Sequence, residues 1–183
     1  ASQTEKEERG LTEAFVGLGS NIEEPAAQLR RACTALAALP NTRLVAVSSV
    51  YESLPMGPSD QPPFLNACAQ IETTTKPAAL LTALLEIEAA MGRVRKRHWG
   101  ERCIDLDLLF YGNTALQSEA LTLPHLGLYE RDFVLRPLAE LLGDEYLMPN
   151  GVDIGTLLQS CPAHGLKLSS AQLHTGETPG NAL

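Results

Sequence analysis

The sequence lacks the features that indicate several common classes of protein. It has only 4 cysteines and 4 histidines in 183 residues and no C-x-x-C pair, so neither a zinc site nor a disulfide framework is indicated. No apolar run approaches the roughly 18 residues that a membrane span needs, and residues 1–10 are polar rather than patterned as a secretion signal. We therefore expect a cytoplasmic protein whose thiols are reduced and mostly buried.

The chain also lacks an excess of positive charge. Its formal net charge of −8 argues against a general nucleic-acid or membrane surface, because both partners favour a basic protein. Five of the 14 lysines and arginines nevertheless fall within residues 93–102. A local basic cluster in an acidic chain suits a small, highly anionic ligand better than a polymer. We expect small-molecule partners, with neither nucleic acid nor membrane among them.

The spacing of apolar residues predicts alternating strands and helices. The predicted strands cover 13–20, 42–52, 64–74, 102–111 and part of 112–124, and the predicted helices cover 26–39, 77–91, 131–142 and 153–160. This order contains the β-α-β-β-α-β pattern of a ferredoxin-like antiparallel sheet. We expect an α/β (α+β) fold of that type, with helices packed on the sheet and further strand and helix elements appended.

The length and the 44% hydrophobic content fit one domain with a full-sized core. We predict a flexible N-terminal tail over 1–12, a single domain over 13–168, a disordered C-terminal tail over 169–183, and a monomer. Residues 53–63 hold four prolines and a glycine, which predicts an irregular loop. Loops of this length in compact domains are often functional.

Two acidic residues lie within a predicted strand. Because strand side chains alternate between faces, Asp105 and Asp107 share one face, and their Cα atoms lie roughly 6 to 7 Å apart. Like charges at that distance repel, so the pair calls for a counter-charge. Mg²⁺ held by the carboxylates, with phosphate oxygens neutralised by nearby arginines, would supply it. The alternative is a solvent-facing pair that contacts Arg102 or Lys96.

Other residues carry weaker signals. GLGSN at 17–21 lacks the features of a phosphate-binding glycine motif, so a tight exit from the first strand is the favoured interpretation. His125 is either a phosphate contact or a packed, hydrogen-bonded histidine. Phe64, Trp99 and Phe133 could stack on a flat heterocycle, although most aromatic residues belong to a core. Asn66 shares a strand face with Phe64, so an amide and an aromatic ring could serve one ligand.

Several stretches together resemble one known family. HWGERCIDLDLL at 98–109, preceded by GRVR at 92–95, closely resembles the signature of the 6-hydroxymethyl-7,8-dihydropterin pyrophosphokinases of the folate pathway. The likeness extends to GLGSN at 17–21, SSVYES at 48–53, GPSDQPPFLNA at 57–67, LPH at 123–125 and ERDFVLRPLAEL at 130–141. The motifs occur in the family's order and span about residues 13–160, so chance agreement is improbable.

The resemblance implies transfer of the β,γ-pyrophosphoryl unit of ATP to the hydroxymethyl oxygen of the pterin, with AMP leaving. Asp105 and Asp107 would coordinate two Mg²⁺ ions. The residues implied in catalysis are Arg93, Arg102, Asp105 and Asp107. The residues implied in pterin binding are Ser53, Leu54, Pro55, Met56, Phe64, Asn66, Asp105 and Phe133, with the two phenylalanines on either side of the ring. The residues implied in ATP binding are Glu88, Arg93, Arg95, Trp99, Arg102, Ile104, His125 and Arg131.

The chain departs from the family pattern in places. Phe64 stands where relatives carry a tyrosine, and Leu126 and Gly127 stand where relatives often carry a proline or tyrosine and a basic residue. The segment 95–99 is one residue shorter than in some relatives. Two other functions stay open from the residues alone: a ferredoxin-like module that binds nucleic acid or regulates without catalysis, and an ordinary kinase or nucleotidyltransferase on the same scaffold.

Overall fold

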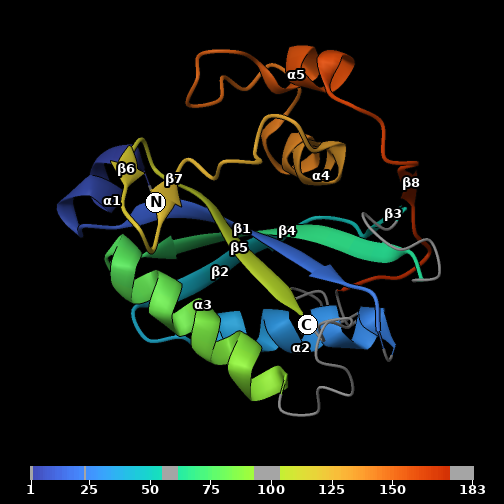
Figure 1. Cartoon of the computed structure of the whole chain (residues 1–183). Helices are drawn as coiled ribbons and strands as arrows, with labels where there is room; N and C mark the ends of the chain where they lie inside the picture. Colours follow the sequence, from blue (N-terminus) through green and yellow to red (C-terminus); the bar gives the residue numbers. More distant parts are fainter. Residues whose placement is uncertain (1, 23, 55–61, 93–103, 174–183) are drawn as a thin grey trace, which may run out of the picture.

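A six-stranded sheet lies between two layers of helices in the computed structural model, which describes residues 2–22, 24–54, 62–92 and 104–173 (Figure 1). The sheet order is β5-β1-β4-β3-β8, and β2 also pairs with β4. The strands of this sheet are β1 (Thr12–Ser20), β2 (Thr42–Val47), β3 (Tyr51–Ser53), β4 (Phe64–Thr73), β5 (Asp105–Tyr111) and β8 (Lys167–Leu168). All of its pairings are antiparallel, as the sequence predicts.

The described helices are α1 (Gln3–Glu8), α2 (Pro25–Ala37), α3 (Pro77–Met91), α4 (Asp132–Leu142) and α5 (Ile154–Ser160). The helices other than α1 divide between the two faces of the sheet. Figure 1 shows α2 and α3 below the sheet and α4 and α5 above it. Pro25 and Pro77 occupy the first turns of α2 and α3, where the missing N–H costs no intrahelical bond. None of the helices in the described part of the chain combines the length and apolar character that crossing a membrane would need.

Each face of the sheet has its own hydrophobic core. The core between the sheet and helices α2 and α3 includes Ala14, Val16 and Leu18 of β1. Phe15, on the opposite face of β1, belongs to the core between the sheet and helices α4 and α5. Its ring stacks on that of Phe110, with ring centroids 4.5 Å apart. This alternation is the period-two pattern of a strand that is covered on both sides. Beyond Phe15, the upper face of β1 carries only Gly17 and Gly19, which leaves space beneath α4.

Several sequence predictions need correction. The strand predicted over 42–52 is two strands, because Ser48 leaves the β2 ladder and its hydroxyl accepts a hydrogen bond from Cys68 N at 2.9 Å. The strand predicted within 112–124 is a small separate hairpin of β6 (Leu116–Gln117) and β7 (Thr122–Leu123). Helix α1 and strand β8 were not predicted. The domain limits of 13 and 168 stay a prediction.

Candidate active site

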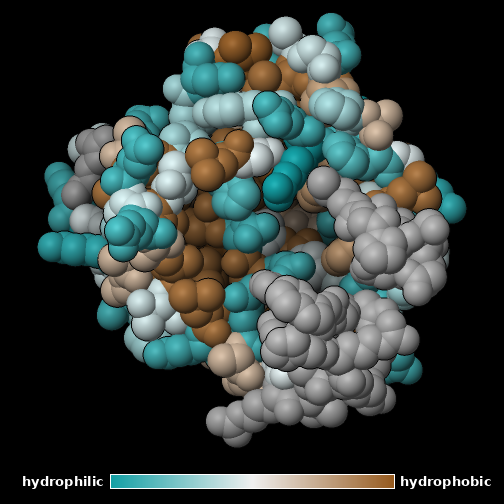
Figure 2. All heavy atoms as spheres, in the orientation of Figure 1, coloured by the Kyte–Doolittle hydropathy of each residue, from teal (hydrophilic) through white to brown (hydrophobic). Residues whose placement is uncertain are grey.

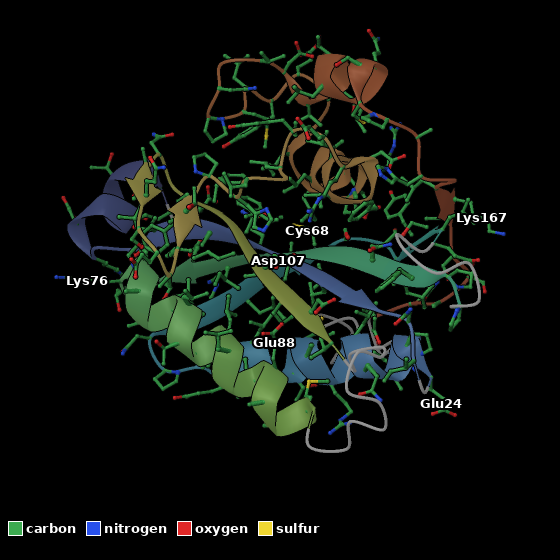
Figure 3. All side chains as sticks on the ribbon, viewed as in Figure 1. Glu24, Cys68, Lys76, Glu88, Asp107 and Lys167 are labelled. Atoms are coloured by element: carbon green, nitrogen blue, oxygen red, sulfur yellow. The ribbon has the colours of Figure 1, made fainter. Side chains whose placement is uncertain are left out.

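A cavity of about 180 Å³ opens on the α4 side of the sheet. Its floor consists of β1, β4 and β5, and its walls come from β3 and the beginning of α4. The lining residues are Gly17, Leu18, Gly19, Ser53, Leu54, Phe64, Asn66, Ala67, Cys68, Asp105, Asp107, Leu109, Arg131, Phe133 and Val134. In Figure 3, Asp107 lies near the centre of the molecule on β5, and hydrophilic side chains gather in this region in Figure 2, beside a hydrophobic surface.

Two glycines of β1 form the centre of the floor. Gly17 pairs with Asp107 on one side and with Cys68 on the other, and Gly19 pairs with Asp105 and Asn66 in the same way. The strand predicted over 13–20 thus matches β1, but Gly17 and Gly19 lie within its pairing ladders rather than at a tight exit, because β1 continues to Ser20. A Cβ atom at Gly19 would lie 3.6 Å from Asn66 Oδ1, at ordinary van der Waals contact. Neither a steric clash nor the backbone conformation requires glycine at this position, but the absence of a side chain leaves space above the sheet for the cavity.

The two acidic residues of β5 share the cavity face, as predicted. Asp105 and Asp107 line the cavity, while Leu106 and Leu108 between and after them are buried in the opposite core. The Leu106 N–H points away from β1 and donates to Glu88 Oε2 at 2.9 Å. Glu88 therefore anchors the outer edge of β5 at the residue between the two carboxylates.

His125 follows the cis Leu123–Pro124 peptide and lies beside Asp107. Its Nε2 atom is 3.9 Å from Asp107 Oδ1. Its Nδ1 atom accepts a hydrogen bond from Gly127 N at 3.0 Å. A neutral imidazole that accepts at Nδ1 carries its proton on Nε2, so the ring directs an N–H toward the carboxylate.

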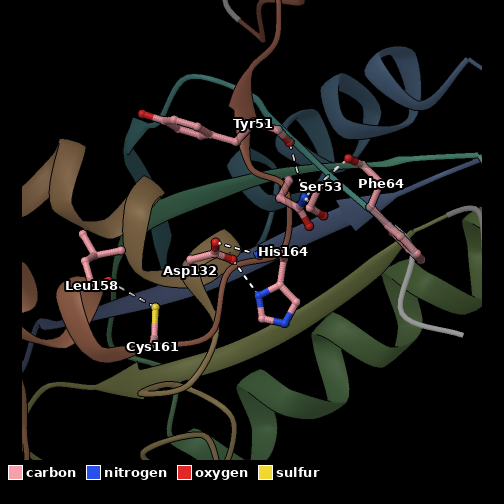
Figure 4. Close-up of polar contacts among 8 residues, drawn as sticks. Tyr51, Ser53, Phe64, Asp132, Leu158, Cys161 and His164 are labelled. Atoms are coloured by element: carbon pink, nitrogen blue, oxygen red, sulfur yellow. Dashed lines mark hydrogen bonds and ion pairs between the residues drawn. The ribbon is translucent and has the colours of Figure 1, made fainter.

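An amide and an aromatic ring meet on β4, as the two-residue spacing predicts. Phe64 and Asn66 both line the cavity. Asn66 Nδ2 donates to Ser53 Oγ at 2.8 Å and to the Tyr51 carbonyl at 3.3 Å, so β3 fixes the orientation of the amide (Figure 4). Burial and a 2.7 Å hydrogen bond to Glu140 raise the pKa of Tyr51 to about 12. Tyr51 is therefore a neutral anchor for this strand.

The first turn of α4 provides the facing wall. Arg131 and Phe133 both line the cavity, and the Arg131 guanidinium carbon lies 5.9 Å from the centre of the Phe133 ring. Gly127 packs against Arg131, since a Cβ atom there would come within 2.5 Å of Arg131 Nε. The departure from the family pattern at residue 127 thus makes room for this arginine beside the aromatic ring.

The remaining predicted site residues fall into two groups. Pro55, Met56, Arg93, Arg95, Trp99 and Arg102 lie outside the described residues. Ile104, Glu88 and His125 are described but do not line the cavity, and Ile104 is buried. Within the ranges that the structure describes, no group of three or more His, Cys, Asp or Glu side chains is arranged to hold a metal ion. Any metal held by Asp105 and Asp107 would need further ligands.

Several lining residues were not predicted from the sequence. They are Gly17, Leu18, Gly19, Ala67, Cys68, Leu109 and Val134. Burial raises the pKa of the Cys68 thiol, so this cysteine is protonated and acts as an apolar part of the floor. The period-two pattern that was applied to Phe64 and Asn66 would have placed Cys68 on the same face.

Comparison with known proteins gives a consistent result. Residues 15–143 match the family described as 7,8-dihydro-6-hydroxymethylpterin-pyrophosphokinase (HPPK). A 2-amino-4-hydroxy-6-hydroxymethyldihydropteridine pyrophosphokinase of Haemophilus influenzae is 47% identical over 151 residues, which cover 82% of this chain and 94% of the relative. The protein of the same description from Pseudomonas aeruginosa is 45% identical over 157 residues, which cover 86% of this chain and 96% of the relative.

Solved structures agree on the fold. The crystal structure of Plasmodium falciparum HPPK-DHPS, wild type with pteroate, superposes with a TM-score of 0.63 over 81% of this chain at 15% identity. This chain spans 42% of that longer one. The likeness supports the predicted α/β fold with a mainly antiparallel sheet, and at this identity it says nothing further about function.

Proposed function

This chain belongs to the 7,8-dihydro-6-hydroxymethylpterin-pyrophosphokinase family, and on that premise we propose how its cavity serves the family's reaction. The enzyme is a pyrophosphokinase of folate biosynthesis, with ATP and hydroxymethyldihydropterin as its substrates. The hydroxymethyl oxygen attacks the β-phosphorus of ATP, the bond between the α- and β-phosphates breaks, AMP leaves, and the hydroxyl proton goes to solvent. The observation that supports our assignment is the meeting of two carboxylates, two phenylalanines and one amide around a single cavity.

The pterin ring would lie between Phe64 of β4 and Phe133 of α4. Both rings line the cavity from different elements, and flat heterocycles are stabilised by stacking on aromatic faces. Asn66 would recognise the polar edge of the ring. Because its Nδ2 group is held by Ser53 and Tyr51, its Oδ1 atom is the group that can accept a hydrogen bond from a pterin N–H. Ser53 and Leu54, with the segment that follows them, would complete this edge.

Asp105 and Asp107 would hold Mg²⁺ together with oxygens of the ATP phosphates. The donor set fits, because Mg²⁺ prefers oxygen ligands and commonly takes one or two carboxylates plus substrate phosphates and water. Two carboxylates on one strand face meet that need without a third protein ligand. When bound, the metal would neutralise phosphate charge and lower the pKa of the attacking hydroxyl. Two ions are expected.

The chain's own groups would then position the triphosphate. His125 directs an N–H toward Asp107 and would orient that carboxylate. Arg131 would contribute a fixed positive charge beside Phe133. Glu88 holds the edge of β5, so it would act on the nucleotide site through the position of the strand. The contributions of Ile104 and of the basic segment, with Arg93, Arg95, Trp99 and Arg102, stay predictions from the sequence, as do the cytoplasmic location and the monomeric state.

The test is an incubation of the protein with ATP, Mg²⁺ and 6-hydroxymethyl-7,8-dihydropterin, with nucleotide products separated by chromatography. We expect AMP and the pterin pyrophosphate in equal amounts, and no turnover after chelation with EDTA. ADP as product would indicate an ordinary kinase. An absence of turnover under all conditions would favour the binding module.

A further inference from the structure

A segment near the C-terminus lies along the outer edge of the site. We call residues 161–169 the C-terminal strap. Its strand β8 pairs with β3, with Leu168 opposite Tyr51 and Lys167 opposite Glu52. One step further along, Leu54 N donates to the carbonyl of His164 at 2.9 Å. The strap thus follows β3 as far as Leu54, a residue of the cavity wall, and it lies outside the 15–143 range that matches the family.

His164 joins the strap to the opposite wall through Asp132. Its backbone N donates to Asp132 Oδ2 at 3.1 Å, and its Nδ1 atom lies 2.8 Å from Asp132 Oδ1. Figure 4 shows both contacts. The side chains of His164 and Asp132 are only 17% and 14% exposed, so water competes little for this pair. Asp132 begins α4 and immediately precedes Phe133, so its position and that of the aromatic wall are coupled.

The His164 ring also contacts the aromatic wall directly. Its centroid lies 5.1 Å from that of Phe133, and the two ring planes are perpendicular at 89°. Such T-shaped pairs are favourable and fix the relative orientation of the rings. On the other side of the strap, Gly165 adopts a positive φ of 62°, and a Cβ atom there would come within 2.8 Å of the Leu54 side chain. The strap backbone therefore packs directly on Leu54.

We infer that His164 is a positioning residue that holds two walls of the pterin pocket, Phe133 and Leu54, in place before substrate arrives. The inference rests on the proposed function, because it assumes that the pterin binds against Phe133. A wall that is already ordered loses less conformational freedom on binding, so its support contributes to affinity for the pterin. ATP affinity should not depend on the strap, since the contacts of His164 with described residues of the cavity walls are to Leu54, Asp132 and Phe133, on the proposed pterin side of the site.

The test measures KM for the pterin, KM for ATP, kcat and the thermal midpoint of the full chain, with AMP release as the assay. His164→Ala removes both the ring and the side-chain bond to Asp132. We expect the KM for the pterin to rise about threefold to tenfold, in line with the loss of an aromatic pair, while the KM for ATP is unchanged. Lys167→Ala is the matched control, because Lys167 lies in the same strap but is exposed, and within the described residues its ammonium group pairs only with Glu52, across 3.7 Å. It should leave all four quantities unchanged.

A second variant separates positioning from folding. His164→Asn keeps a side-chain donor near the place of Nδ1, so the strap stays attached to Asp132 even if the alanine variant does not fold. Because the ring is absent, we still expect a raised KM for the pterin. An active wild type with an unchanged pterin KM in both variants, or with equal losses for both substrates, would overturn this inference alone. A wild type that forms no AMP would overturn the proposed function and this inference with it.

Discussion

His125 directs its Nε2 atom at Asp107 across 3.9 Å, while its other ring nitrogen is occupied by the N–H of Gly127. The hydrogen bond from Gly127 fixes the histidine in one orientation and one tautomer, with its Nε2 proton on the side of Asp107. If Asp107 holds Mg²⁺ as we propose, His125 would orient that carboxylate. The backbone N of His125 donates to the Leu109 carbonyl at 2.8 Å, so the ring is held close to β5 by the main chain as well.

This geometry predicts different effects for two substitutions of His125. His125→Ala removes the group that faces Asp107, and activity should fall about tenfold or more, as for other partners of metal ligands. His125→Gln carries an amide N–H near the place of Nε2 and should retain more activity than the alanine variant. Steady-state rates of AMP release check the order. Equal loss in both variants would contradict a role for the Nε2 proton.

Replacement of either acidic residue should reduce turnover by orders of magnitude and leave the fold intact. Asp105→Asn and Asp107→Asn keep the shape of the side chain but remove the charge that a divalent cation requires. We expect the rate to fall by about two to four orders of magnitude in each variant, with an unchanged circular dichroism spectrum. The Mg²⁺ concentration for half-maximal activity should rise where activity remains measurable. If both variants kept wild-type rates, the metal assignment would be wrong.

The floor glycine should show opposite effects on stability and function. Gly19→Ala fits its surroundings, since the nearest atom is 3.6 Å away and the backbone needs no positive φ. Alanine in a strand is more favourable than glycine by about 0.5–1 kcal/mol, so the thermal midpoint should stay the same or rise. The added methyl group projects into the cavity beside Asn66, so the KM for the pterin should rise. A destabilised variant with normal pterin affinity would show that the pterin binds elsewhere.

The N-terminal helix gives the protein a defined response to acid. Lys6 Nζ lies 2.7 Å from Glu72 Oε1, and this contact holds the pKa of Glu72 below its ordinary value of 4.5. The unfolded state therefore takes up a proton first as the pH falls, so this contribution to stability is present above pH 4.5 and is lost as the pH falls through the lower folded value.

Lys6→Met should weaken this dependence. We expect the free energy of unfolding, measured by urea denaturation, to change less between pH 7 and pH 4 in the variant than in the wild type. Lys76→Met is a suitable control, because Lys76 is an exposed residue at the beginning of α3 (Figure 3). If Lys6→Met showed the same pH profile as the control, the ion pair with Glu72 would contribute nothing in solution.

Local periodicity was sufficient to predict part of the site. Asp105 and Asp107 share a face of β5, and Phe64 and Asn66 share a face of β4, because side-chain alternation in a strand depends on neighbours in sequence alone. Gly17 and Gly19 fall within the strand predicted over 13–20, but their place in the cavity floor was missed, since nothing local shows that two partner strands flank them.

Contacts between distant segments could not be predicted. Glu140 accepts a hydrogen bond from Ser49 N, 91 positions earlier, and His164 contacts Asp132, 32 positions earlier. Strand β8 has only two residues, both exposed, so its sequence carries no alternating pattern and its pairing depends on where β3 lies. Ser48 to Val50, between β2 and β3, keep the composition of a strand although Ser48 leaves the ladder. In each case the deciding interaction is tertiary.

The hydrogen bond from Leu106 N to the Glu88 carboxylate limits how this protein can associate with a second molecule through the edge of its sheet. In the described part of the sheet β5 is an outermost strand, and such a strand can recruit a second chain through its unpaired amides. The Glu88 carboxylate accepts a hydrogen bond from the outward-facing N–H of Leu106, between the two aspartates, and places a negative charge there. Intermolecular sheet extension is therefore blocked at the residue between Asp105 and Asp107.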